Sequence, residues 1–471
     1  MKKRSNKTWN WIKQHYTSLL TGLIILICLG LRIAIYGDMR YSIGTNDSSS
    51  YYTQANIPLF SWEAWTARRL PSYPMFFRLF QPDGGYPEMT AVSYPAAPGV
   101  GERDKVIQPG FEPVVLAQAI IAMFAWVVFV LVLCRHLKVK IMRPIAAGII
   151  LLFAFSPSLA EWDSILMSES LSFSLFTLMM TLTLELFFRV SIEKKNPGTL
   201  SKVLMLLWAL LVPAWAFMRD SNAQTLIILV VFFIAFFLIP GIRKNMPVFW
   251  VAGIGLWVLF LYGWYSYTTS AANRWAWGWF DIYNHWVSLY PARKQFFLDH
   301  GMPDPWTHEW VQESGTKTYF LFLISHPGFM VTELLGRLSD AFSENVQPFF
   351  FTYPTLPRKM VLAIGDIFHP LSSTAFLFPL FSGILIFIAA IRNSLQQNKH
   401  WFWLVLWLVS MIYGQYAASF YGDSGGLIRH TLGAVVYMRL MIWLLPIILL
   451  EVINHGKNSS SRSNSKRTAS S

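Results

Sequence analysis

Among the few charged residues of this sequence, Asp47 has the surroundings best suited to chemistry. It lies in the hydrophilic stretch 44–52 (GTNDSSSYY), a few residues after the first long apolar run. A carboxylate at a membrane surface can accept a proton as a general base, and charges at such places are by default functional. The alternative is structural, because Asp and Ser are also preferred N-cap residues, and Tyr51 and Tyr52 would suit an interfacial aromatic belt. Spacing alone does not separate the two interpretations.

A second acidic segment, residues 156–170, contains three carboxylates and no basic residue. It is a short connection between two apolar runs, so we expect Asp163 and Glu169 to lie at the same membrane depth as Asp47. The structural alternative is a pair of helix caps on either side of a turn. Asp47 and Asp163 could together bind a divalent cation through oxygen ligands. No spacing motif for metal ligands is present, so the sequence predicts no definite cofactor.

Two arginines stand at the ends of apolar runs on the same side as these acids. They are Arg219 and Arg429, and His430 follows the second one. Arginine is the preferred partner of phosphate, because its planar guanidinium binds two oxygens at once. The alternative role is anchoring at lipid headgroups. Carboxylates and arginines on one side of a membrane predict a site for a lipid phosphate, with Arg219, Arg429 and His430 as its binding residues.

The composition identifies the elements that must position these residues. Of the 471 residues, 54% are apolar and only 13% are charged, whereas soluble domains carry roughly 25% charged residues. An ordinary soluble protein is therefore excluded, and apolar runs of about 20 residues predict membrane-spanning helices. We predict about ten spans, at residues 17–36, 112–134, 143–160, 168–189, 203–218, 222–240, 247–266, 373–391, 401–420 and 433–451.

The formal net charge of +13 is distributed as in a multi-pass membrane protein. Basic residues gather before the first predicted span, in every second connection and in the tail after the last span, while the short connections on the other side hold one or none. Lys and Arg are enriched in cytoplasmic connections. We therefore predict a protein of the cell membrane with both termini in the cytoplasm, and the charge pattern gives no indication of a nucleic-acid partner.

The predicted fold is an all-α polytopic membrane protein with interfacial helices in two long outer loops. The N-terminal transmembrane catalytic module covers residues 1–266 and includes the first outer loop, 37–111. The second outer loop covers 267–372, and its apolar run 318–342 is broken by Pro327 and Gly328. We interpret that run as interfacial or re-entrant. The C-terminal transmembrane helices follow at 373–455, and the Ser-, Lys- and Arg-rich residues 456–471 are predicted to be a disordered cytoplasmic tail.

The order of these features resembles the GT-C superfamily of polyprenyl-phosphate-dependent glycosyltransferases, in the branch of bacterial protein mannosyltransferases and aminoarabinose transferases. The first span ends in LRIAIYGD, and DSSSYYTQA follows from Asp47. The segments FSPSLAEWDSILMSESLSFSLF and ISHPGFMVTELLGRL complete the similarity. It covers the order of elements over most of the chain and is densest in residues 20–240.

The resemblance implies a GT-C-like fold and a role for each candidate residue. Asp47 would be the catalytic base or lie beside it, and Asp163, with Glu169 as the alternative, would assist or help bind a metal. Arg219 and Arg429 would hold the donor phosphate. Asn46 stands where the commonest family pattern has a second acid, which leaves a metal requirement open.

The implied activity is transfer of a hexose or pentose from a polyprenyl-phosphate donor to an acceptor at the non-cytoplasmic face, with inversion at the sugar carbon. Its partners would be the lipid-linked donor, the membrane lipids and a glycan, lipid or protein acceptor of the cell envelope. Two alternatives remain open from the residues alone. One is a polymerase or ligase of lipid-linked glycans, which would not need Asp47. The other is a transporter or flippase, whose polar residues would lie near the middle of the membrane.

Overall fold

The computed structural model describes most of the chain, and within the described residues every regular element is a helix. Two isolated β-bridges join Ile43 to Ile107 and Ile43 to Ile165. The all-α fold class is thus confirmed. The described residues are 2–36, 42–45, 47–58, 61–87, 107–193, 197–238, 247–343, 356–372, 374, 377–392, 395–422 and 427–468.

Seven described helices are long and apolar enough to cross a membrane. Each overlaps one of the ten predicted spans, and a helix of this length is stable in hydrocarbon because its backbone hydrogen bonds are formed within the segment. They are α1 (Lys2–Tyr36), α6 (Glu112–His136), α9 (Glu169–Glu193), α10 (Thr199–Ala216), α13 (Val248–Ala271), α22 (Leu395–Gly422) and α23 (Leu427–Thr468).

The other three predicted spans correspond to shorter apolar helices. The span at 143–160 is a bent pair, in which α7 (Met142–Ala154) meets α8 (Pro157–Ala160) and the 3₁₀ helix η2 (Glu161–Ser164) at an angle of 51°. Pro157 is the first residue of α8. It lacks the backbone N–H that would continue the hydrogen bonds of α7, so a new helix begins there. The remaining two are α11 (Asp220–Leu238) and α21 (Leu377–Arg392).

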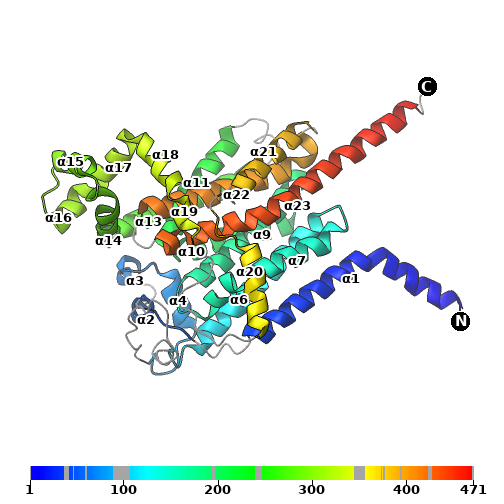
Figure 1. Ribbon diagram of the computed structural model, residues 1–471, viewed down its shortest axis with the longest axis horizontal. Helices are drawn as coiled ribbons and strands as arrows, with labels where there is room; N and C mark the ends of the chain where they lie inside the picture. The colour runs from blue at the N-terminus through cyan, green and yellow to red at the C-terminus, as the bar shows by residue number, and fades with distance from the viewer. Residues whose placement is uncertain are drawn as a thin grey trace.

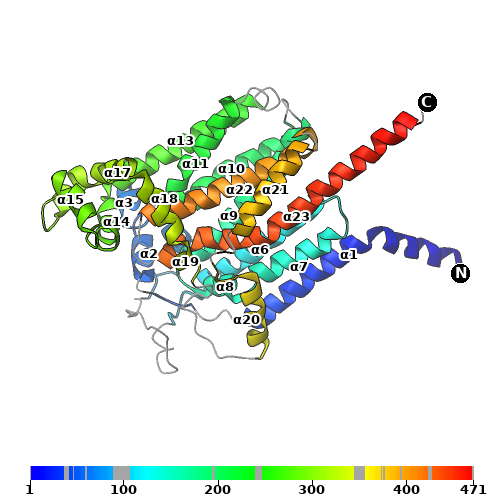
Figure 2. The ribbon, with the colours of Figure 1, turned by 45° about the horizontal axis from the view of Figure 1, so that its top comes forward.

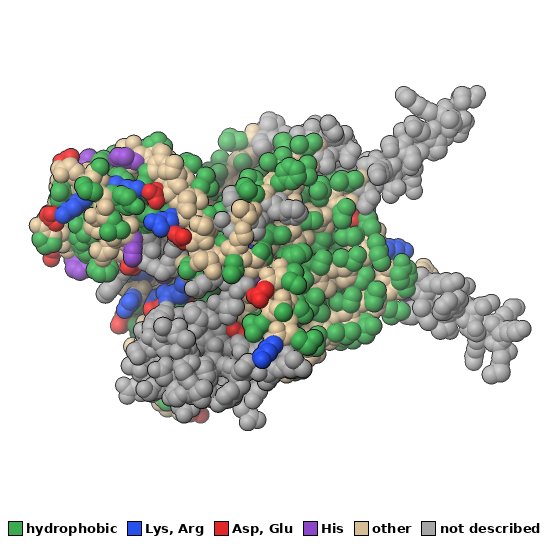
Figure 3. Space-filling model, viewed as in Figure 1, with side chains coloured by type: hydrophobic (Ala, Val, Ile, Leu, Met, Phe, Trp, Pro, Cys, Tyr) green, Lys and Arg blue, Asp and Glu red, His purple; other side chains and the backbone are tan. Residues whose placement is uncertain are grey.

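The long helices run side by side along the longest axis of the molecule (Figures 1 and 2). Both termini lie at one end of this bundle, and the helices within residues 48–79 and 275–336 lie at the other end (Figure 1). The flank between the two ends is covered mainly by hydrophobic side chains (Figure 3). Phe249 and Leu256 of α13, for example, are mostly exposed. An exposed apolar flank of this kind fits the hydrocarbon of a bilayer, so the protein is a multi-pass membrane protein.

The described part of the first outer loop contains three short helices: α2 (Ser48–Ala55), α3 (Trp62–Thr66) and α4 (Ser72–Leu79). Its aromatic residues form a separate small core around Tyr51, Tyr73, Phe77 and Phe111. Tyr51 and Tyr73 meet edge to face with ring centroids 4.9 Å apart, a favoured geometry for aromatic pairs. Tyr51 is therefore a core residue, and the expected interfacial anchoring does not describe it.

The second outer loop has its own aromatic core, made by Trp279, Trp286, Phe297, Trp310 and Phe322. Its helices and π-helical turns are α14 (Trp275–Ile282), η3 (Tyr283–Val287), α15 (Pro291–Asp299), α16 (His308–Trp310), η4 (Val311–Gly315), α17 (Thr316–Ser325), α18 (Pro327–Gly336), α19 (Leu338–Ala341) and α20 (Leu356–Phe368). The run predicted as interfacial or re-entrant is bent by 88° between Ser325 and Pro327, so it does not form one straight helix.

Helix α23 extends to Thr468 and so includes most of residues 456–471, the predicted disordered tail. No proline follows Pro446 in this sequence, and proline is the residue that interrupts a helix most strongly. Asn46, and with it the question of a second acid beside Asp47, lies outside the described residues, as do 37–41 and 88–106 of the first outer loop.

Candidate active site

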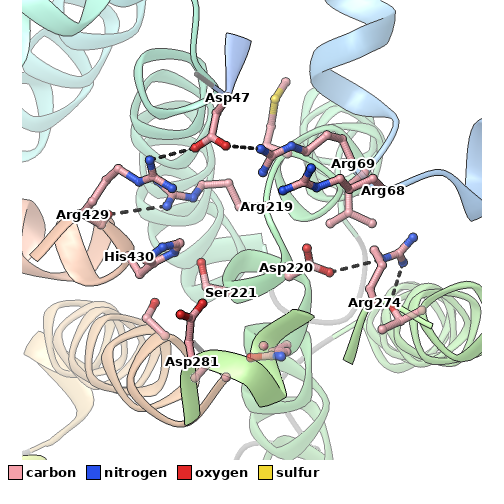
Figure 4. Close-up of a pocket in the computed structure, with 18 of the residues that line it drawn as sticks. Asp47, Arg68, Arg69, Arg219, Asp220, Ser221, Arg274, Asp281, Arg429 and His430 are labelled. Atoms are coloured by element: carbon pink, nitrogen blue, oxygen red, sulfur yellow. Dashed lines mark hydrogen bonds and ion pairs between the residues drawn. The ribbon is translucent and has the colours of Figure 1, made fainter. Parts of the chain in front are cut away.

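A cavity of about 480 Å³ lies at the end of the bundle where both outer loops meet the long helices (Figure 4). Five of the six residues predicted from the sequence line it, and these are Asp47, Glu169, Arg219, Arg429 and His430. They come from chain segments that are far apart in the sequence, so the fold brings them together. Lys and Arg side chains gather in the hollow beside the lobe of α14–α18 (Figure 3).

The carboxylate of Asp47 lies between two guanidinium groups (Figure 4). Its Oδ1 is 2.5 Å from Nη2 of Arg69, and its Oδ2 is 2.8 Å from Nη1 of Arg429. Burial raises the pKa of Asp47, but the two arginines outweigh burial, so the net pKa lies below the ordinary value of 3.8. Asp47 precedes α2, yet its side chain makes no capping hydrogen bond. The capping interpretation is therefore wrong for the side chain, which is directed to the arginines.

Backbone contacts with the segment after η2 position Asp47. The backbone N–H of Ile43 donates to the carbonyl of Ser164 at 2.8 Å, and the N–H of Leu166 donates to the carbonyl of Ile43 at 2.8 Å. The hydroxyl of Ser48 donates to the carbonyl of Leu166 at 2.8 Å. These bonds connect the residues on both sides of Asp47 to one turn and so hold Asp47 in position.

Arg69 is held as firmly as its partner. Its Nε donates to the hydroxyl of Ser50 at 2.8 Å, and its guanidinium lies 4.8 Å above the ring centroid of Tyr51. The side chain of Gln54 bonds both the N–H and the carbonyl of Arg69. The arginine thus keeps its position without a ligand, so little entropy has to be lost when an anion binds.

Glu169 and Arg219 form a further ion pair of the cavity, at 3.0 Å. Glu169 is the first residue of α9 and is almost completely buried, while Arg219 lies between α10 and α11. A guanidinium N–H of Arg219 also donates to the carbonyl of Arg429 at 3.5 Å. Glu169 therefore serves as the counter-ion that holds Arg219 beside Arg429.

The sixth predicted residue, Asp163, lies apart from the cavity. Its Oδ2 is 2.7 Å from Nη2 of Arg32 in α1, and its Oδ1 accepts the hydroxyl of Ser170 at 2.5 Å. Both members of the ion pair are buried. Arg32 also donates to the carbonyl of Ala160, so the pair ties α1 to the turn that positions Asp47. This geometry favours a structural role for Asp163, and its predicted role in catalysis stays a prediction.

No group of three or more His, Cys, Asp or Glu side chains is arranged to hold a metal ion in the described parts of the chain. Asp47 and Asp163 are the two residues considered as ligands of a shared cation. Asp163 is instead in an ion pair with Arg32, and Asp47 is in ion pairs with two arginines. These two carboxylates do not fit a shared metal.

Several cavity residues were not identified from the sequence: Arg68, Arg69, Asp220, Arg274 and Asp281. Arg274 lies 3.5 Å from Asp220 and donates to the hydroxyl of Thr269 at 2.5 Å. One signal was present in the sequence. Arg68 and Arg69 are adjacent on the side where few basic residues are expected, and that departure marks them as functional candidates.

The cavity is suited to a phosphate. Five arginines face four carboxylates, and three of those carboxylates are already in ion pairs with arginines. Each guanidinium has five N–H donors in a planar fork, and an ion pair with a carboxylate uses one or two of them. The arginine N–H groups that remain can bind the oxygens of a phosphate without breaking the existing pairs.

No protein-family model matches the chain, and no curated protein sequence matches it. Among solved structures the chain is similar to the archaeal oligosaccharyltransferase AglB from Archaeoglobus fulgidus in complex with an inhibitory peptide and a dolichol-phosphate, with 15% identity and a TM-score of 0.44. It is also similar to the Archaeoglobus fulgidus oligosaccharyltransferase tethered to an acceptor peptide containing the NVT sequon, with 14% identity and a TM-score of 0.41. Each comparison covers 92% of this chain and 50% of the other. The chain therefore spans half the length of these structures, and the roles of its cavity residues rest on its own geometry.

Proposed function

We propose that this protein is an integral membrane glycosyltransferase that moves a sugar from a polyprenyl-phosphate donor to an acceptor at the non-cytoplasmic face. One observation carries the proposal: Asp47 and the arginines 69, 219 and 429 converge in one cavity at the end of the bundle away from the termini. Such a cavity combines phosphate-binding groups with an ionised carboxylate, as this reaction needs.

The arginines would bind the donor phosphate and stabilise the charge that develops on it. When the bond between the sugar C1 and the phosphate oxygen breaks, negative charge builds on the departing polyprenyl phosphate. Positive groups that are already in place stabilise this charge without reorganisation. Arg219 and Arg429 suit the task because Glu169 and Asp47 fix their positions.

Asp47 would be the base. A carboxylate has about four lone-pair positions, and the two ion pairs leave part of this capacity for the hydroxyl of an acceptor. The acceptor oxygen forms the new bond to C1 while its proton passes to Asp47, and the phosphate leaves from the opposite side. A single displacement of this kind inverts the configuration at C1. Because phosphate is already a fair leaving group, positioning would supply much of the rate.

The direct test is mass spectrometry of lipids that copurify with the protein in mild detergent. Wild type should carry a polyprenyl-phosphate sugar, and the double variant Arg219→Ala/Arg429→Ala should carry much less of it. Incubation of the loaded protein with a cell-envelope extract should then transfer the sugar. Absence of a lipid-linked sugar together with absence of transfer would overturn the proposal.

A flippase is separated from a transferase by reconstitution into liposomes. A transferase consumes the lipid-linked sugar and forms a new glycosidic bond, whereas a flippase moves the intact lipid between leaflets. Movement of intact lipid with no bond formed would favour the transporter class. A polymerase or ligase of lipid-linked glycans would retain activity in the variant Asp47→Asn.

A further inference from the structure

The second outer loop supplies a separate wall of the cavity, opposite the arginines of the bundle. The wall is formed by α14 and the residues that lead into α16, and its members in the cavity include Gly278, Phe280, Asp281, Trp306 and His308. None of them is needed for the phosphate chemistry proposed above. This wall is therefore free to bind the other substrate.

A close backbone contact sets the position of α14. A Cβ added at Gly278 would lie 2.6 Å from the carbonyl oxygen of Gly422, the last residue of α22. Only glycine permits such an approach. Asp281 follows three residues later and so lies on the same side of the helix. The contact that docks α14 thus directs Asp281 into the cavity, where it lies across from Asp47 (Figure 4).

Asp281 differs from the other acids of the cavity. Asp47, Glu169 and Asp220 each have an arginine partner. Asp281 forms no ion pair or hydrogen bond with any other residue that the structure describes, and its side chain is half-buried. An unpaired carboxylate in a cavity is a strong acceptor for hydroxyl groups, because charged acceptors form the stronger hydrogen bonds.

An aromatic surface lies beside this carboxylate. The indole of Trp306 has Phe280, Tyr283 and His308 as ring neighbours, with centroids 6.4, 6.1 and 5.6 Å away. All three meet it at steep angles of 66°, 60° and 79°. None of these rings therefore stacks flat on the indole, and Phe280 is itself 54% exposed.

We propose that this wall binds a sugar unit of the acceptor, so that the acceptor is a glycan. The indole of Trp306 packs against the C–H face of a neutral pyranose ring, and Asp281 accepts hydrogen bonds from its hydroxyl groups. This inference rests on the proposed transferase function. Addition of an extended peptide to a strand edge is not available in the described part of the chain, which contains no sheet.

The test measures sugar binding directly, without a donor. Purified full-length protein in detergent is labelled and applied to an array of neutral oligosaccharides built from glucose, mannose, galactose or N-acetylhexosamines. Wild type should bind at least one class. Trp306→Leu and Asp281→Asn should each weaken that binding at least tenfold, whereas Trp306→Phe should keep part of it.

Matched controls separate recognition from misfolding. Trp62→Leu removes an exposed tryptophan of the first outer loop, and Asp299→Asn removes an exposed carboxylate of the second one. Both should bind as wild type does, and all variants should unfold at similar temperatures. Wild-type binding no stronger than that of Trp306→Leu/Asp281→Asn would overturn the inference.

Two outcomes separate the sugar site from the transferase function. Transfer of the donor sugar to a peptide or lipid, at rates unchanged in Asp281→Asn, would overturn the glycan acceptor and leave the transferase in place. Array binding that depends on Trp306 and Asp281, in a protein that neither carries nor consumes a lipid-linked sugar, would support the sugar site and reject the transferase.

Discussion

Asp47 and Arg429, which lie near opposite ends of the sequence, form an ion pair of 2.8 Å. Asp47 stands just before the short helix α2, whereas Arg429 lies in the first turn of α23, the last helix of the chain. The cavity is therefore complete only when the C-terminal helix has packed against the N-terminal half. This dependence explains why residues so distant in sequence have to be tested as one unit.

The variant Asp47→Asn should lose transfer by about 10²–10⁴-fold, the usual contribution of a general base. Expression and binding of the donor lipid should stay close to wild type, because the arginines that would hold the phosphate remain. Initial rates with purified protein, together with lipid mass spectrometry, measure both quantities. Asp83→Asn changes an exposed carboxylate of the same outer loop and should have no effect. Normal turnover of Asp47→Asn would reject Asp47 as the base.

Arg429→Lys should lower kcat/KM although the positive charge is kept. Lysine lacks the planar fork that can bind Asp47 and a phosphate at the same time, so at least one charge-assisted hydrogen bond is lost. A loss of about 1.5 kcal/mol corresponds to roughly a tenfold lower rate constant. The matched control is Arg337→Lys, a partly exposed arginine paired with Asp340. Equal effects of the two changes would contradict a special role for Arg429.

Asp163→Asn should act through stability. The change leaves the buried guanidinium of Arg32 without its counter-ion, and breaking a buried pair from one side costs about 3–5 kcal/mol. The thermal midpoint in detergent should fall, and activity should fall with it. The double variant Arg32→Met/Asp163→Leu should recover much of the stability. A normal midpoint with abolished transfer in Asp163→Asn would instead support the catalytic role that the family resemblance implies.

The stabilisation of the fold by the ion pairs of Asp47 should decrease at acidic pH. The pKa of Asp47 is lower in the folded protein than its ordinary value of 3.8, so its ion pairs stabilise the fold above that value and lose this effect as the pH falls through the folded pKa. The difference in thermal midpoint between wild type and Asp47→Asn should thus be constant from about pH 5 to 8.

Removal of one arginine should shift the acidic side of the pH–rate profile for transfer. Arg69→Gln removes one of the two charges that lower the pKa of Asp47, and one neighbouring opposite charge is worth about 1–3 pKa units. Transfer by this variant should fall off at a higher pH than transfer by wild type. Identical pH–rate profiles would show that ionisation of Asp47 does not control the rate.

Gly278→Ala should displace α14, because the added Cβ would meet a backbone oxygen at 2.6 Å and not a flexible side chain. Transfer should decrease, and limited proteolysis should cut the second outer loop faster. Gly336→Ala is the control, since a Cβ at Gly336 meets nothing within 4 Å. Unchanged proteolysis of Gly278→Ala would show that the contact between Gly278 and Gly422 does not position the loop.

The sequence determined the class of the protein and the order of its elements. Apolar runs of a length that spans a bilayer can only be helices there, because every backbone N–H and carbonyl needs a partner inside the segment. The same logic predicted that Asp47, Glu169, Arg219, Arg429 and His430 would stand at helix ends on one side, and the fold places all five around one cavity.

Only the tertiary structure decided which charges face each other. Asp163 and Glu169 have the same local signal, a carboxylate in a short connection, yet Asp163 is paired with Arg32 and Glu169 lines the cavity with Arg219. Pairing of this kind depends on how α1, α9 and α23 pack, which no local pattern contains. Asp281 became a candidate only after the close approach of Gly278 to Gly422 placed its helix beside the cavity.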